Sequence, residues 1–147
     1  MEKQLIKELK NLGNKVLEKQ KGKKEFKKKF DLLKTKVFKP FVNEASKIEC
    51  ISLLFFSDDT SNLPEHKNRN FFRIVYINND TKNQNLGRSS IHLNIEGRPE
   101  NSTILLSQRV APDTNTIIEN VAEYSIDSVK KDMLENHIMD FLRIVLN

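Results

Sequence analysis

The chain has 147 residues, 37% hydrophobic and 31% charged, which fits one globular domain and excludes a disordered chain. Its single cysteine, Cys50, excludes an internal disulfide and a zinc site built from several cysteines. The net charge of +5 is uneven, because residues 1–40 hold 14 Lys, no Arg and 5 acidic residues (net +9), and the other 107 residues hold 11 basic and 15 acidic ones (net −4).

Residues 1–40 are predicted to form a basic helical arm, distinct from a core domain over residues 41–147. Apolar residues in the arm recur at alternating steps of four and three, the spacing of a coiled-coil helix. This apolar seam consists of Leu5, Leu9, Leu12, Val16, Phe26, Phe30, Leu33 and Val37. Lys19 and Lys23 occupy the same register between its two halves, so the halves are in phase. We expect the seam to bind a partner helix or a second copy of the chain.

The arm can be one long helix or a helical hairpin. We favour two helices, because Gly22 lies between Lys21 and Lys23, glycine costs about 1 kcal/mol in a helix interior, and the like charges repel. Proline disfavours a helical conformation at the residue before it, so Lys39 and Pro40 are predicted to mark a boundary. Pro40 would then open a short helix that reaches Ile48.

A lysine cluster surrounds Gly22 and consists of Lys21, Lys23, Lys24, Lys27, Lys28 and Lys29. Such point charges suit phosphate backbones or an acidic protein surface. No arginine occurs among the first 68 residues, and no helix-turn-helix or ribonucleoprotein motif is present, so nucleic-acid contact would not be sequence-specific. The alternative is an uninvolved, solvated helix face.

From residue 49 the apolar residues alternate as they do in strands. Five strands are predicted, over residues 50–56, 70–78, 91–96, 103–110 and 117–126. Their sequential links are short, which favours an antiparallel sheet. The strand over 70–78 is apolar on both faces, so we expect it to be central, with the N-terminal helices or a second subunit covering its second face. Cys50 is predicted to be an inert, buried thiol.

Residues 129–145 carry an apolar stripe at helical spacing and are predicted to form a helix packed on the sheet. The predicted class is therefore α+β: basic N-terminal helices, a five-stranded, mainly antiparallel sheet and a C-terminal amphipathic helix.

Candidate chemical groups are few. The three histidines have no metal-ligand spacing, and no cofactor motif is present, so we expect neither a metal nor a cofactor. The densest group of titratable residues lies in one loop, which we interpret as solvated: Asp58, Asp59, Glu65 and His66.

The polar sheet face offers the remaining candidate site, formed by Arg73, His92, Glu96 and Arg109 if the strands bring them together. These residue types could serve a small enzyme. The alternative is an exposed face with cross-strand ion pairs.

These patterns predict a non-catalytic interaction or adaptor protein that acts, through its N-terminal helices, as a homo-oligomer or as a subunit of a larger complex. A sequence-nonspecific nucleic-acid binder and a small enzyme are the alternatives. The N-terminus is charged where a signal peptide needs an apolar core, and no apolar run approaches the ~20 residues of a membrane span. We therefore expect a cytoplasmic protein without membrane contact.

Overall fold

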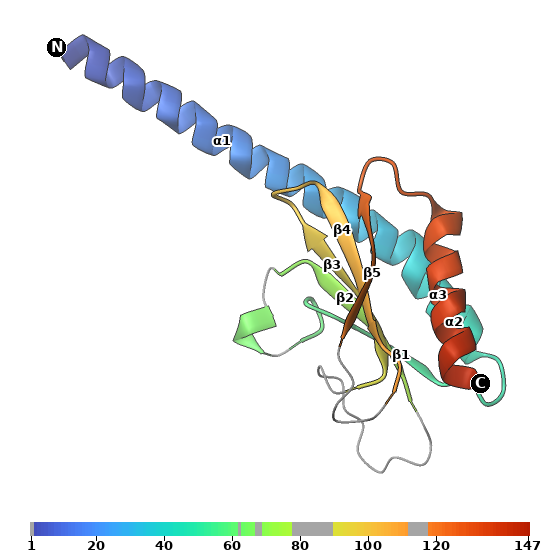
Figure 1. The fold of residues 1–147 in the computed structure, drawn as a ribbon. Coiled ribbons are helices and arrows are strands. Elements are labelled where there is room, and N and C mark those ends of the chain that lie inside the picture. The colour runs from blue at the N-terminus through green and yellow to red at the C-terminus, as the bar shows by residue number, and fades with distance from the viewer. Residues whose placement is uncertain (1, 62, 67–68, 78–89, 112–117) are drawn as a thin grey trace.

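The fold is centred on one antiparallel sheet of five strands, paired in sequence order (Figure 1). A computed structural model describes residues 2–61, 63–66, 69–77, 90–111 and 118–147. The strands are β1 (Leu53–Ser57), β2 (Phe71–Tyr76), β3 (His92–Arg98), β4 (Thr103–Arg109) and β5 (Glu119–Ser125). Both the α+β class and the sequential antiparallel sheet are confirmed.

The N-terminal arm is one continuous helical rod, so the preference for two helices is wrong and the long-helix alternative is right. Helix α1 (Glu2–Leu33) runs through Gly22 into a π-helical turn, η1 (Lys34–Phe38), and then into α2 (Lys39–Ser46). The C-terminal helix is α3 (Lys131–Leu146), and a 3₁₀ turn, η2, spans Pro64–His66. Gly22 costs the helix too little to break it when the next turns are anchored in the core.

Pro40 does not end the rod, contrary to the predicted boundary. A proline inside a helix lacks the N–H donor, and its ring crowds the carbonyl four residues earlier. The preceding η1 turn is wider than an α-helical turn: the backbone N–H of Lys39 donates to the carbonyl oxygen of Lys34, five residues back. This local widening allows the helical path to pass the proline.

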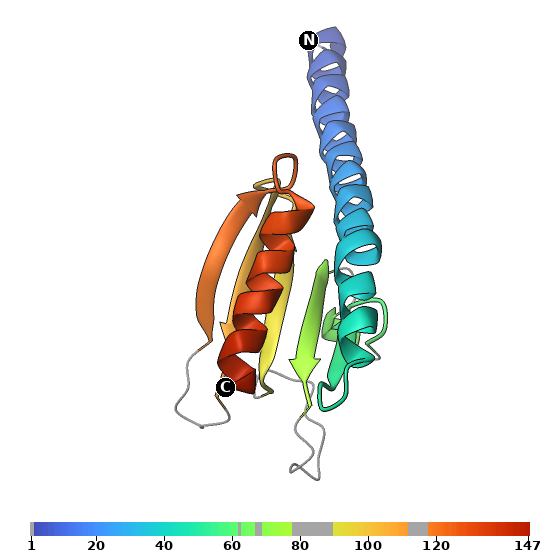
Figure 2. The ribbon, with the colours of Figure 1, turned by 90° about the vertical axis from the view of Figure 1, so that its right-hand side faces the viewer.

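All helices that cover the sheet lie on the same face of it (Figure 2). Phe72 and Ile74 of β2 point into this core, together with Phe30 from α1 and Phe141 from α3, and each is fully buried. The prediction that the N-terminal helices would cover the second face of β2 is therefore wrong. On that second face, the ring of Phe71 is instead covered by Phe56 and by the guanidinium groups of Arg69 and Arg73.

Of two further expectations, one is confirmed and one is wrong. The apolar strand β2 is an interior strand, as expected, with β1 and β3 on either side of it, and β3 is the middle strand of the five. Cys50 is exposed rather than buried, because the chain turns there with a φ of 71° and β1 begins only at Leu53. A left-handed backbone conformation is typical of a turn, not of a strand.

Gly97 marks the point where α1 crosses the sheet. A Cβ atom at this position would lie 2.7 Å from a ring carbon of Phe26, so only glycine lets the helix approach so closely. The turn between β3 and β4 follows directly, and in it the N–H of Asn101 donates to the carbonyl oxygen of Arg98 at 3.1 Å.

Candidate functional site

The first half of α1 extends well beyond the sheet and the other helices (Figures 1 and 2). Every residue from 2 to 25 is exposed, and we call residues 2–22 the projecting segment. It carries large apolar side chains that are between 52% and 67% exposed: Leu5, Ile6, Leu9, Leu12, Val16 and Leu17. In general, a large exposed apolar patch is typical of a surface that contacts another protein or a membrane.

The apolar seam is divided between two environments. Its first four residues lie on the projecting segment, whereas Phe26, Phe30 and Val37 are at most 5% exposed within the chain's own core. Leu33 packs against the same core. The half of the seam beyond residue 25 is therefore packed in the core of the chain. Only the half before residue 25 is exposed to solvent.

The lysine cluster lies at the base of the projecting segment. Lys23, Lys24 and Lys27 border a shallow hollow of about 280 Å³ together with Asn70 and Pro99. Elsewhere in the cluster, Lys21, Lys28 and Lys29 are exposed. The ammonium group of Lys29 donates a hydrogen bond to the Asp127 carboxylate, and this bond raises the pKa of Lys29.

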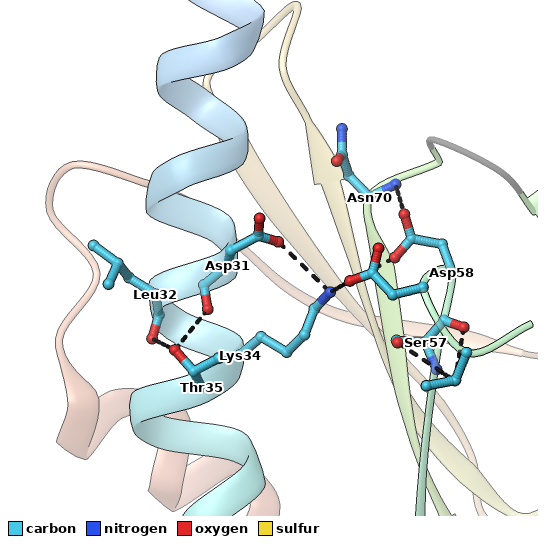
Figure 3. Close-up of polar contacts among 9 residues, drawn as sticks. Asp31, Leu32, Lys34, Thr35, Ser57, Asp58 and Asn70 are labelled. Carbon is cyan, nitrogen blue, oxygen red and sulfur yellow. Dashed lines mark hydrogen bonds and ion pairs between the residues drawn. The ribbon is translucent and has the colours of Figure 1, made fainter.

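Lys34 connects the rod to the loop after β1 (Figure 3). Its side chain is only 4% exposed, and its Nζ lies 2.7 Å from Asp59 Oδ2, 3.7 Å from Asp58 Oδ1 and 3.6 Å from Asp31 Oδ1. Asp58 Oδ2 also accepts a hydrogen bond from the Asn70 backbone N–H at 3.1 Å. The hydrogen bond from Lys34 lowers the pKa of Asp59. This contact links the rod to the loop that follows β1.

The interpretation of that loop as solvated is wrong for Asp58, whose side chain is 2% exposed. Sequence reasoning missed the ion pair because 23 positions separate Asp58 from Lys34. Glu65 and His66 lie in η2, and Glu65 is exposed. Within the described part of the chain, no group of three His, Cys, Asp or Glu residues could hold a metal ion.

The sheet face opposite the helices brings together most of the candidate polar residues. Arg73, His92 and Glu96 line one hollow of about 440 Å³. Arg109 pairs with His92 across β3 and β4 but does not line this hollow, and its guanidinium lies 3.4 Å from the carbonyl oxygen of Ser90. His92 is 1% exposed, and its Nδ1 lies 2.9 Å from the same oxygen.

Comparison with known proteins adds no relative: no family model, curated protein or solved structure matches this chain. Among the described residues, no helix is both long enough and apolar enough to cross a lipid bilayer.

Proposed function

We propose that this protein is a non-catalytic interaction protein that self-associates through the projecting segment. The supporting observation is the exposed apolar stripe on a helix that extends into solvent. A single helix of this length is marginally stable in water, and this one contains Gly13 and Gly22, around which a side chain would meet open space. Burial of the stripe against another helix would offset this cost.

A second copy of the chain, running antiparallel, fits the stripe. The two apolar positions of the seven-residue repeat are called position a and position d. In an antiparallel pair, position a of one helix faces position d of the other. With Leu9 opposite Leu12 of the second copy, Leu5 comes opposite Val16, and the twofold symmetry repeats both contacts. All four seam residues of each projecting segment are then buried.

The charges of the segment complement each other in this same register. Glu2 is the seam position before Leu5, and Lys19 is the seam position after Val16. In this register Glu2 of one copy lies opposite Lys19 of the second copy. The positions that flank the seam place Glu8 opposite Lys15, again twice by symmetry. Opposite charges at such flanking positions set the orientation and partner choice of paired helices.

Side-chain size agrees with the charges. On the other flank of the seam, Ile6 of one copy comes opposite Gly13 of the other, so a large side chain meets a position without one. The glycine, which weakens an isolated helix, would here make room for the partner. The overlap covers residues 2–19, about 26 Å of helix, and ends before Phe26, where α1 enters the core.

A parallel pair lacks these matches. It would place Lys19 against Lys19 and Lys23 against Lys23 within the seam, and Glu8 would face Gly13 instead of a lysine. The two sheets would also lie at the same end of the helix pair. Charge and shape therefore both favour the antiparallel arrangement.

Charge exchange at the flanking positions tests this arrangement. Glu8→Lys alone and Lys15→Glu alone should each weaken self-association about tenfold, because each sets like charges opposite one another twice. The double variant should recover wild-type association, and an equimolar mixture of the two single variants should form mixed dimers. Sedimentation equilibrium near 100 μM measures all four samples at a concentration suited to a short seam.

Lys10→Glu is the matched control, since it makes the same charge change on an exposed position away from the seam. Its association should equal that of the wild type. Dimers that are insensitive to Glu8 and Lys15 would contradict the antiparallel register but leave self-association standing. A wild-type chain that remains monomeric at this concentration would contradict the proposed function itself.

Nucleic-acid contact is a second candidate function, favoured by the three lysines that border the hollow at the base of the segment. Changing Lys23, Lys24, Lys27 and Lys28 to Glu should then abolish binding. Fluorescence anisotropy of labelled duplex DNA and single-stranded RNA, at about 50 and 200 mM salt, measures it, and the salt slope should fall by about one for each phosphate contact removed.

The control for this experiment reverses Lys3, Lys7, Lys10 and Lys36, which changes the net charge equally but leaves the cluster intact. Equal losses in the two variants would indicate a response to net charge alone. Unaltered affinity in the cluster variant would contradict this candidate function.

A further inference from the structure

The hollow on the sheet face opposite the helices has the composition of an anion-binding site. It is about 440 Å³ in volume, within the range of small-molecule sites, and its lining is predominantly polar. Among the described lining residues, three are arginines, Arg69, Arg73 and Arg98, and one is a carboxylate, Glu96. The formal charge of the described lining residues is therefore positive, even with a neutral His92.

Strand register builds the floor of this hollow. Arg73 of β2 is aligned with Asn94 of β3, which is aligned in turn with Ser107 of β4 and Asn120 of β5. These four side chains form one polar row across four strands. The row depends on pairing between strands that are far apart in the sequence, so no local sequence motif indicates it.

One hydrogen bond sets the direction of the Asn94 amide. The Nε of Arg73 donates to Asn94 Oδ1 at 3.2 Å, so the amide oxygen is engaged and the Asn94 NH₂ remains as the donor end. Arg73 is itself held over the ring of Phe71, at 5.8 Å from the ring centroid. A guanidinium and an amide donor are thereby held side by side on rigid strands.

The carboxylate of Glu96 would compete with a bound anion for the arginine side chains of this hollow. Its carboxylate lies 3.8 Å from the guanidinium of Arg69, and the neighbouring Arg98 is paired with Glu123 at 3.7 Å. Both carboxylates are more than a third exposed, so water screens these pairs and either can be exchanged for another anion.

We propose that this hollow binds the phosphate group of a small molecule. Planar guanidinium groups match phosphate oxygens with paired hydrogen bonds, and the Asn94 and Asn120 amides add neutral donors. Leu105 and Ile118 line the same hollow and offer apolar contact to the rest of the ligand. This site is independent of the projecting segment, so neither proposal depends on the other.

Two substitutions with opposite expected effects test the proposal. Arg73→Gln should weaken binding at least about tenfold, because it removes a charged donor. Glu96→Gln should strengthen binding several-fold, because it removes the competing carboxylate while keeping the side-chain shape. Isothermal titration calorimetry of the full chain in 150 mM chloride, with inorganic phosphate, a sugar phosphate and a nucleoside monophosphate, measures the affinities and distinguishes the sources of the phosphate group.

Arg143→Gln is the matched control, since Arg143 is exposed on α3 and paired with Asp140, and it should leave binding unchanged. Melting curves of each variant verify that the fold is retained. Saturable binding at one site, with both expected shifts, would support the proposal. No saturable binding of any of the three probes to the wild type and to Glu96→Gln would overturn it. Binding that Arg73→Gln leaves unaltered would also overturn it.

Discussion

A variant in which Leu9 and Leu12 are both replaced by Asp is expected to sediment as a monomer at concentrations where the wild type is a dimer. In the antiparallel register these two leucines face each other at the centre of the helix pair, and burial of a leucine contributes roughly 1.5–3 kcal/mol. The variant removes four leucines per dimer and sets carboxylates against one another. The dissociation constant should therefore rise by at least about 1,000-fold.

Leu17→Asp provides the control for this experiment. Leu17 is 63% exposed, as Leu9 and Leu12 are 67% and 56% exposed, but it lies off the seam. A substitution at Leu17 reduces the exposed apolar area but leaves the proposed contact between Leu9 and Leu12 intact, so the variant should still dimerise. Thermal melting of the sheet should be the same in all three proteins, because α1 enters the core only at Phe26. Dimers in the Leu9 and Leu12 variant, or equal loss in the control, would contradict the assigned contact.

The second large effect is expected at Lys34. Its replacement by Ala should lower the free energy of unfolding by about 3–5 kcal/mol, since Asp58 would remain as a buried carboxylate without its cation. For a domain of this size, such a loss lowers the melting temperature by roughly 10 °C. Circular dichroism during thermal unfolding measures the change.

Two comparisons separate the ion pair from a general effect of losing a lysine. Lys36→Ala removes an exposed lysine from the same π-helical turn and should change stability little. Asp58→Asn, combined with Lys34→Ala, should recover part of the loss, because the unpaired charge is gone. A Lys34→Ala variant as stable as Lys36→Ala would show that the pair does not hold the rod to the sheet.

The strands and the turn between β3 and β4 were predictable because their signals are local. Alternation of apolar and polar residues in β3, together with the turn at Pro99, specifies a hairpin without reference to the rest of the chain. The continuity of the rod was not predictable from Gly22 and Pro40, which are local breaking signals. Buried Phe26 and Phe30 anchor the helix beyond Gly22, and the wider η1 turn precedes Pro40.

The candidate sites, too, were predictable only where they depend on local sequence patterns. The period of the seam was visible in the sequence, and so were the residues on the polar face of β3. That Asn94 would be aligned with Arg73 and Ser107 depends on strand register, which the spacing of apolar residues along one strand does not reveal. The burial of Asp58 depends likewise on a lysine brought from another element.

By itself, the sequence determined the α+β class, the order of the strands and one in-phase seam along the first helix, because periodicity and turn chemistry act over a few neighbouring residues. Only the tertiary structure decided that the seam is buried from Phe26 onward and exposed up to Val16. The reason is physical: both halves have the same spacing and chemistry, and the sheet covers only the length of helix that lies across it.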